Sequence, residues 1–509
     1  VGADQRAQIL SEQPSAWARP WGPAALAVLV AFAVGTLALR RTSTITDDWQ
    51  GWRQADTQAM ARSQAFEEFS PWSPRIDWRG DGAGYVEAEM PIYPALLAPA
   101  LALLGDSVWP GQLLSLTCVL AAAALLFRAL ALRFGGAPAL VALVAVLLGQ
   151  GAIVIAPSIQ PDTLAFLAFT IAWLAFLRFL AHGRWRDLAL WVGATAIAGL
   201  VKPTTLELGL AQGLLVLLAH RHALRQLRLW LGWLVVLAAV AAYLWHARQL
   251  YLTHGNTFGV LSGGDSKLPA LSRLLEPRSW FDLGRYAVAW GVTWPGLIAA
   301  IFLVVRRRLD AESVALGVAA AALCVLAFRY TSGPFGTHYH LPHAVLGAHL
   351  VARAIAEAKA GSRALGAAAI AVACAAALFG GLRAVKFVRR LPPQPETALG
   401  EDLVRFAPPG TLIAVRARAE SYNVEWQTVN NYEDPRIFYL SRTRGWVLPN
   451  DLKGPKGPAR LAELAARGAR FYVHVLQYEP DADLRDYLAT SAQLMSSSPA
   501  GLIYALRVK

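Results

Sequence analysis

The chain has 509 residues, of which 56% are hydrophobic and only 16% are charged, and its formal net charge is +13. Ordinary soluble domains carry about 25% charged residues, so this composition predicts a polytopic α-helical membrane protein. An excess of Lys and Arg is typical of cytoplasmic loops that face anionic headgroups, and no basic run has the polar context of a nucleic-acid-binding surface, so we expect no nucleic-acid partner.

Runs of about 20 apolar residues predict helices that cross a bilayer. With the N-terminus on the cytoplasmic side, eleven such helices are expected: 21–39, 110–132, 137–156, 162–181, 187–201, 205–220, 229–250, 283–305, 311–330, 341–356 and 364–382. In this topology nearly every cytoplasmic connection is net basic, as the positive-inside rule requires. The apolar segment 91–105 is too short to span, and we expect it to lie along the outer membrane surface.

Three parts follow from this layout. Residues 1–20 form a cytoplasmic N-terminus, and residues 21–382 form a transmembrane domain whose first extracytoplasmic loop, 40–105, contains interfacial helices. The composition changes near residue 383, and short alternating elements follow. Three of these stretches are predicted strands, at 410–417, 469–476 and 501–508. Between the first two strands, residues 458–468 are predicted to form an amphipathic helix. This pattern predicts a small extracytoplasmic α/β domain over 383–509.

The first loop contains the stretch "DDWQGWRQADTQAMARSQAF", which begins at Asp47 and reads as a short helix at the outer interface. Asp48, Trp52 and Asp56 would share one face of this helix at intervals of four residues. We interpret Asp47 as the helix N-cap. Asp56 falls mid-helix, where Asp is a poor helix former and no cap is needed, so a functional role is predicted for it.

Two further outer loops carry ionisable residues next to prolines. Asp162 stands at the start of a predicted helix, where a carboxylate can also simply stabilise the helix dipole. Lys202 lies at the outer membrane boundary, where a lysine can either snorkel to the headgroups or contact a phosphate. Glu89, just before the interfacial segment, is a weaker candidate because surface acids are usually solvated.

The stretch "FRYTSGPFGTHYHLPHA" gathers one arginine, one candidate tyrosine and three histidines near a helix start: Arg329, His338, Tyr339, His340 and His343. A His-x-His pair followed by a third histidine could bind a metal. No carboxylate or cysteine is close in the sequence, and histidines beside an arginine suit a phosphate equally well. The three cysteines, Cys118, Cys324 and Cys374, lie in apolar stretches and show no disulfide or zinc pattern.

Together these motifs resemble the GT-C superfamily of membrane glycosyltransferases. They comprise "WRQADTQAMAR" at 52–62, the E-x-P-x-Y-P entry into the interfacial segment, a P-D loop, a K-P-T loop and the His-Pro helix start. Within the superfamily the chain is similar to the bacterial branch related to protein O-mannosyltransferases and to the transferase that adds aminoarabinose to lipid A. The resemblance covers about residues 20–382.

The resemblance implies a hexosyl- or pentosyltransferase of the cytoplasmic (inner) membrane. Such an enzyme moves a sugar from a polyprenyl-phosphate donor to a lipid, glycan or protein acceptor on the outer face. It also implies an essential aspartate in the first loop, which Asp56 matches best and Asp48 second. Many relatives carry an adjacent Asp-Glu pair here. This chain does not, so the choice between the two carboxylates stays open.

Chemistry assigns the remaining roles. A lipid phosphate leaves as a stabilised anion, so one base and a few cations suffice, and single displacement with inversion is expected. The expected contacts to the donor phosphate are Lys202, Arg329, His338, His340 and Arg53. The expected contacts to the sugar or acceptor are Asp162, Glu89, Trp52 and Tyr339.

No obligatory cofactor or metal is expected, although a divalent metal is possible. Two alternative functions stay open. An O-antigen ligase or polymerase would place its key residues in one large late loop, whereas the longest polar loop here is the first. A secondary transporter or flippase of lipid-linked sugars would show internal repeats and polar residues near mid-membrane. Neither feature is evident, because the ionisable groups gather at one interface.

Overall fold

The computed structural model describes residues 21–40, 45–262, 271–417, 422–423, 428–429, 434–478 and 482–507. The chain divides into two compact units. Unit 1 comprises Val1–Thr42, Gly111–Ala241 and Lys267–Arg390, and unit 2 comprises Ser43–Pro110, Ala242–Ser266 and Leu391–Lys509. The first loop and the C-terminal region therefore belong to the same unit, although they are more than 280 residues apart in the sequence.

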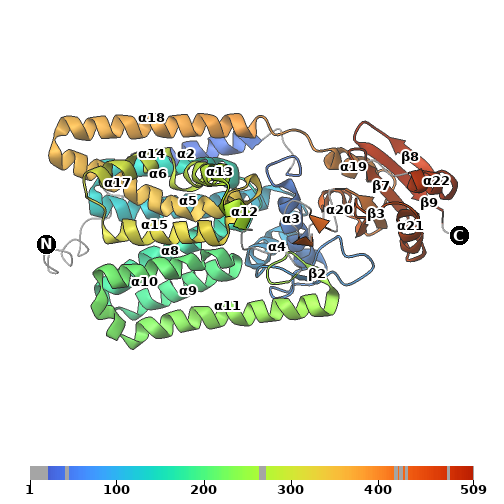
Figure 1. Ribbon diagram of the computed structural model, residues 1–509, viewed down its shortest axis with the longest axis horizontal. Coiled ribbons are helices and arrows are strands. Elements are labelled where there is room, and N and C mark those ends of the chain that lie inside the picture. Colours follow the sequence, from blue (N-terminus) through green and yellow to red (C-terminus); the bar gives the residue numbers. More distant parts are fainter. Residues whose placement is uncertain are drawn as a thin grey trace. The chain divides into compact units, whose positions relative to one another are not determined.

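Unit 1 is helical (Figure 1). Its helices, two of which (α5 and α11) extend beyond it, are α2 (Trp21–Arg40), α5 (Trp109–Phe134), α6 (Gly136–Leu147), α7 (Gln150–Ile155), α8 (Asp162–His182), α9 (Trp185–Val201), α10 (Glu207–Ala219), α11 (Leu227–His254), α12 (Leu271–Leu274), α13 (Pro277–Ala287), α14 (Trp294–Val305), α15 (Ala311–Leu326), α16 (Phe328–Thr331), α17 (Ala344–Gly361) and α18 (Arg363–Val388). Four short elements complete it: the 3₁₀ turns η2 (Pro203–Leu206), η3 (Arg221–Arg225) and η5 (Pro334–His343), and the π-helix η4 (Val288–Val292).

Within the described residues, five helices are long and apolar enough to cross a membrane: α2, α5, α8, α11 and α18. The helices over Pro277–Val292 and Trp294–Val305 give a sixth if this pair, bent by 103°, is one span. The expected count of eleven is therefore not confirmed. Several expected spans are broken, among them 137–156 between α6 and α7, 283–305 at Thr293, whose φ is 71°, and 311–330 at Ala327. Hydropathy does not reveal such breaks, because the residues that make them are apolar or neutral.

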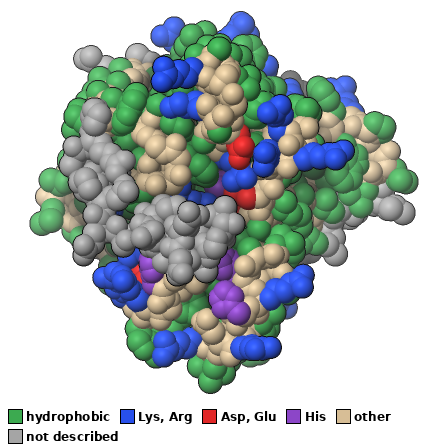
Figure 2. Space-filling view, turned by 90° about the vertical axis from the view of Figure 1, so that its left-hand side faces the viewer, with side chains coloured by type: hydrophobic (Ala, Val, Ile, Leu, Met, Phe, Trp, Pro, Cys, Tyr) green, Lys and Arg blue, Asp and Glu red, His purple; other side chains and the backbone are tan. Residues whose placement is uncertain are grey.

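The basic connections between helices lie at one end of unit 1, on the left in Figure 1. Figure 2 faces this end and shows Lys and Arg side chains gathered on it. Ion pairs link several connections: Arg133 binds Glu312, and Arg353 lies 2.9 Å from Asp310. These are the connections that the expected topology places in the cytoplasm, and that side assignment stays a prediction.

Close backbone packing positions η5 within unit 1. A Cβ atom on Gly291 of η4 would lie 2.4 Å from the carbonyl oxygen of His340, and one on Gly347 of α17 would lie 2.1 Å from the carbonyl oxygen of Val292. At these distances a side chain would collide with the carbonyl oxygen, so both positions require glycine. Small residues likewise allow close backbone approach between helices in membranes. The segment that carries the histidines therefore packs closely against η4, because Gly291 leaves room for its backbone.

Unit 2 contains a five-stranded mixed sheet in the order β6 (Arg444–Val447), β3 (Leu412–Arg416), β7 (Phe471–Val475), β9 (Gly501–Leu506), β8 (Ala492–Ser497). Strand β3 runs parallel to β6 and β7, whereas β7, β9 and β8 are antiparallel. Helices α19 (Pro395–Leu403) and α20 (Arg436–Ser441) pack on one face, and α21 (Lys456–Ala466) and α22 (Ala482–Ser491) on the other. Alternation along β3 explains both cores, because Ile413 and Val415 enter one and Ala414 the other.

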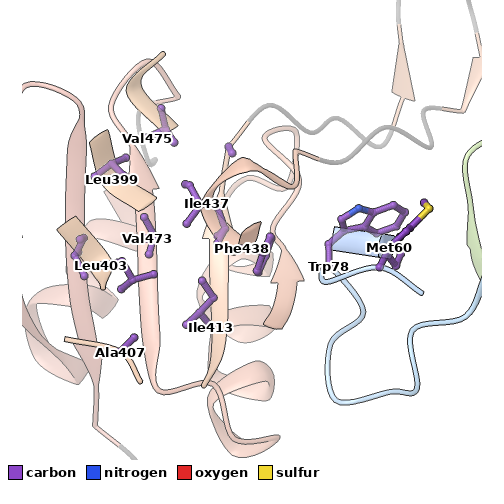
Figure 3. Packing of buried hydrophobic residues seen from close by; sticks show 14 of the residues in the cluster. Met60, Trp78, Leu399, Leu403, Ala407, Ile413, Ile437, Phe438, Val473 and Val475 are labelled. Carbon is purple, nitrogen blue, oxygen red and sulfur yellow. The ribbon is translucent and has the colours of Figure 1, made fainter. Parts of the chain in front are cut away.

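The first loop supplies part of one of these cores. Its elements are α3 (Gly51–Phe66), β1 (Val86–Glu87) and α4 (Ile92–Leu104), and β1 pairs in parallel with β2 (Asn256–Thr257). A further antiparallel pair joins β4 (Tyr422–Asn423) and β5 (Thr428–Val429). Met60 and Trp78 belong to the same buried cluster as Leu399, Ile437 and Val473 (Figure 3). The first loop and the C-terminal sheet therefore share a hydrophobic core.

Candidate functional site

The acidic stretch of the first loop begins with a tight turn. Helix α3 starts at Gly51 after Gln50, which is the N-cap residue in a left-handed conformation (φ 53°). Asp47 Oδ1 instead accepts the backbone N–H of Gln394 at 2.8 Å. The prediction that Asp47 caps the helix is therefore wrong, because its carboxylate joins the first loop to the C-terminal region.

Asp56 is buried in the first half of α3, with 3% of its surface exposed. The indole Nε1–H of Trp78 donates to its Oδ1 at 3.0 Å. Trp78 is itself fixed by the hydrophobic core and by an edge-to-face contact with Phe258 at 5.6 Å between ring centroids. A well-packed neutral donor thus sets the orientation of the carboxylate that the sequence singled out.

Asp48 lies before the helix rather than on it. Its Oδ1 accepts the backbone N–H of Trp49 at 2.6 Å, and its Oδ2 accepts Gln54 Nε2 at 3.0 Å. Asp48 therefore braces the first turn of α3. Nearby, Arg53 Nη2 lies 3.8 Å from Glu89 Oε1, and Trp52 is partly exposed.

A further charged cluster of unit 2 was not predicted. Arg62 binds Asp77, lies 3.5 Å from Asp106 and donates to the backbone oxygen of Tyr439 at 3.1 Å. Burial alone would lower the pKa of Arg62, but the two carboxylates outweigh it and raise that pKa. Arg62 was within the quoted family motif, whereas no local pattern marked its partners.

Three predicted residues from separate loops meet in unit 1. Lys202 Nζ lies 3.6 Å from Asp162 Oδ1 and 4.8 Å from the centre of the Tyr339 ring. Asp162 and Lys202 are each 3% exposed, and Tyr339 is half-buried. A buried ammonium between a carboxylate and an aromatic face is held by both charge and cation–π attraction.

Two other predicted phosphate contacts, His338 and Arg329, lie shortly before Tyr339 in the chain. The His338 ring lies 4.3 Å from that of Tyr339, centroid to centroid, and His338 is buried. Arg329 is half-buried, with its guanidinium 5.6 Å from the Tyr330 ring. Both residues therefore remain candidates for the role that the sequence predicts.

The last predicted phosphate contact, His340, has both ring nitrogens directed at protein atoms. Its Nε2 donates to the carbonyl of Thr331 at 3.0 Å, and its Nδ1 lies 3.9 Å from Cys324 Sγ. Burial, reinforced by neighbouring His343, lowers the pKa of His340 to about 3, so the ring is neutral at pH 7. This geometry favours a role other than phosphate binding.

His343 completes a group of potential metal ligands. Its Nε2 lies 3.2 Å from both carboxylate oxygens of Glu207. One ligand atom from each of Cys324, His340 and His343 lies within 4.8 Å of the other two. The sequence analysis placed Cys324 in an apolar stretch with no zinc pattern and did not single out Glu207, because neither residue is close to the histidines in the chain.

Comparisons with known proteins agree with the resemblance drawn from the motifs. A family model described as "Dolichyl-phosphate-mannose-protein mannosyltransferase" matches residues 88–246, about a third of the chain. No match was found among curated proteins. The family match supports glycosyltransferase activity.

Solved structures show the fold. The crystal structure of ArnT from Cupriavidus metallidurans bound to undecaprenyl phosphate is similar with a TM-score of 0.55 at 13% identity, over 94% of this chain and 97% of that one. The archaeal oligosaccharyltransferase AglB from Archaeoglobus fulgidus, in complex with an inhibitory peptide and a dolichol-phosphate, gives 0.56 at 12% identity, over 95% and 74%. These structures show the fold, and the family match over residues 88–246 agrees with the resemblance to the GT-C superfamily; the chain is a multi-pass membrane protein with this fold.

Proposed function

We propose that this protein transfers a sugar from a polyprenyl-phosphate donor to an acceptor on the outer face of the cytoplasmic membrane. The family match and the GT-C fold support a glycosyltransferase, and two of the similar structures hold undecaprenyl phosphate or a dolichol-phosphate. The observation that carries the proposal is the environment of Asp56, a buried carboxylate oriented by Trp78.

Asp56 acts as the base in this proposal. The acceptor oxygen forms a bond to the anomeric carbon, and the bond from that carbon to the phosphate oxygen breaks. The acceptor proton passes to Asp56, and the polyprenyl phosphate leaves as an anion. One displacement inverts the anomeric carbon, and a positioned base of this kind contributes roughly 10²- to 10⁴-fold to the rate.

Lys202 is proposed to contact the donor phosphate and stabilise it as it leaves. Its ammonium is confined by Asp162 and by the Tyr339 ring, so it needs little reorganisation when negative charge develops nearby. Arg329, His338 and Arg53 are the other proposed phosphate contacts.

The remaining predicted residues are assigned to the sugar or the acceptor. Tyr339 and Trp52 offer aromatic surfaces, and each is partly exposed. Glu89 orients Arg53, with which it pairs, and Asp162 orients Lys202. Asp48 supports α3, which carries Asp56, rather than replacing Asp56 as the base.

The test is transfer by the purified, detergent-solubilised protein from a panel of polyprenyl-phosphate hexoses and pentoses. The wild type is compared with Asp56→Asn and with Asp81→Asn, a matched control. Asp81 lies in the same unit, but its side chain is 41% exposed and pairs with Arg467. We expect an inverted product from wild type and Asp81→Asn, and a loss of about 10²- to 10⁴-fold for Asp56→Asn.

Two outcomes contradict the proposal. Full activity of Asp56→Asn would remove the base assignment. No transfer by the wild type from any donor, combined with movement of a lipid-linked sugar across proteoliposomes, would favour a flippase instead.

A further inference from the structure

A buried cysteine, two histidines and a glutamate form a cluster in unit 1 that the proposed reaction does not use. Cys324, His340 and His343 are 6%, 0% and 3% exposed. Cys324 belongs to α15, both histidines belong to η5, and Glu207 begins α10. Three elements of the chain thus bring sulfur, nitrogen and oxygen ligands together away from solvent.

The two histidines are oriented as metal-binding histidines usually are. A carbonyl oxygen only accepts hydrogen bonds, so the proton of His340 is on Nε2, which donates to Thr331, and Nδ1 faces Cys324 Sγ. In the same way, Nε2 of His343 donates to the Glu207 carboxylate. Ligating histidines commonly donate their second N–H to a carbonyl or carboxylate, which fixes the ring and raises its basicity.

One nitrogen is left with no partner in the part of the chain that the structure describes. His343 Nδ1 is buried and makes no hydrogen bond there. A buried polar atom of this kind loses its hydration without compensation, which is unfavourable by about 1–3 kcal/mol. A metal ion bound at Nδ1 would supply the missing interaction.

We propose that Cys324, His340 and His343 bind a borderline-soft transition-metal ion of the zinc class. Tetrahedral zinc with one sulfur and two nitrogen ligands places those atoms about 3.4–3.6 Å apart. Cys324 Sγ and His340 Nδ1 lie 3.9 Å apart, and one ring nitrogen of His343 lies within 4.8 Å of a ligand atom of each of the other two residues. Small side-chain rotations close the remaining gap, and a water molecule takes the fourth position.

Charge and protons balance in this site. Binding of a divalent ion displaces the Sγ proton of Cys324 to solvent and forms a metal–thiolate bond. Thiolate and imidazole together select zinc or a similar ion over magnesium or calcium, which prefer oxygen ligands. Glu207 orients His343 and contributes negative charge near the ion.

The ion would act by positioning. It would join η5 to the end of α15 and, through Glu207, to the start of α10. Tyr339 immediately precedes His340 on η5 and covers the ammonium of Lys202. Metal binding therefore fixes the segment that holds this aromatic ring in place.

The experiment uses the purified full chain after chelation and a titration with Co²⁺, which reports thiolate ligation by a charge-transfer absorption band. The variant Cys118→Ser/Cys374→Ser is decisive, because Cys324 is then the chain's single cysteine. We expect one Co²⁺ per chain, the band at full intensity, and displacement of cobalt by Zn²⁺. Absence of stoichiometric binding, or of the band, in this variant and the wild type would overturn the proposal.

Two further variants identify the remaining groups. Cys324→Ser should lose the band, and a band retained in that variant would contradict the assignment. Glu207→Gln should keep the band but bind metal about 10- to 100-fold more weakly, as loss of an orienting carboxylate does. An affinity equal to wild type would show that Glu207 has no part in the site. None of these readouts depends on sugar transfer.

Discussion

Asp162 of unit 1 and Asp56 of unit 2 are both buried, but different groups contact their carboxylates. In unit 1 the buried Asp162 faces the Lys202 ammonium, and the partly exposed Asp310 faces His349 and Arg353. In the first-loop part of unit 2, several carboxylates accept hydrogen bonds from neutral N–H groups, and others form ion pairs with arginines. Asp56 accepts from an indole, and Glu87 accepts the backbone N–H of Ser262 at 2.9 Å.

The difference matters for chemistry. An ion pair fixes a cation in place, so the cation needs little reorganisation when negative charge develops on a phosphate nearby. A neutral donor orients a carboxylate without cancelling its charge, which suits a group that must receive a proton. Unit 2 is not uniform in this respect, because Arg62 and Asp77 form an ion pair there.

Among substitutions of the groups that contact the Asp162 and Asp56 carboxylates, removal of the unit 1 cation should have the largest effect. Lys202→Met should reduce kcat/KM by about 10²- to 10³-fold and destabilise the protein by about 3–5 kcal/mol, because the buried Asp162 carboxylate loses the ammonium that it faces. Transfer assays and thermal unfolding in detergent measure the two effects, and Lys359→Met, at an exposed lysine, is the control.

The double variant Asp162→Asn/Lys202→Met separates charge balance from catalysis. Stability should return to within about 1–2 kcal/mol of wild type, while transfer stays low. Recovery of transfer in the double variant would mean that Lys202 serves only to neutralise Asp162, and this would contradict its proposed contact with the donor phosphate.

A smaller effect is expected from removing the neutral donor in unit 2. Trp78→Phe keeps an aromatic ring in the core but deletes the N–H that reaches Asp56. A hydrogen bond to a charged group contributes about 1.5–3 kcal/mol, so kcat should fall at least about 10-fold with little change in KM. Trp72→Phe, at an exposed tryptophan, should leave kcat unchanged. An unaltered kcat in Trp78→Phe would show that the indole does not orient the base.

The buried His474 of unit 2 should make the stability of that unit depend on pH. In β7, His474 Nδ1 lies 3.1 Å from the hydroxyl of Tyr472, and burial, followed by the charge of Arg416, lowers the pKa of His474 to about 4. The unfolded chain takes up a proton near pH 6.5. The neutral ring therefore contributes stability that is complete above this pH and is lost as pH falls toward 4.

Between pH 7.5 and 5 this lowers the free energy of unfolding of unit 2 by about 2 kcal/mol. Pulse proteolysis in urea at the two pH values measures it on the full chain. His474→Gln should flatten the dependence, whereas a substitution of the exposed His254 should not. An identical slope in His474→Gln would contradict the assignment.

The smallest effect is expected for an ion pair exposed to solvent. Arg467 and Asp81 lie 2.6 Å apart with side chains about two-fifths exposed. Arg467→Ala should change the free energy of unfolding by less than about 1 kcal/mol, since exposed pairs are screened by water and salt. A loss as large as that of Lys202→Met would mean that burial does not distinguish the two kinds of ion pair.

Part of this architecture was accessible from the sequence. Alternation predicted strands at 410–417, 469–476 and 501–508, and β3, β7 and β9 lie within these stretches. The K-P-T and P-D loops were predicted to carry site residues, and Lys202 and Asp162 do meet. By contrast, the boundary placed at residue 383 separates regions that share a core, namely the first loop and the C-terminal sheet. Deleting 395–509 would therefore also expose Met60 and Trp78, so point substitutions are the better test of whether this region selects the acceptor.

Composition and hydropathy by themselves indicated a membrane protein and showed where apolar and polar segments alternate, but they did not give the number of long apolar helices. They can show these segments because a bilayer selects for polarity segment by segment along the chain. Only the tertiary structure decided which groups face one another: Asp56 with an indole, Asp162 with an ammonium, and His343 with Glu207, 136 residues away. Hydrogen bonds and ion pairs depend on distances of a few ångströms between residues remote in sequence, and no local pattern records those distances.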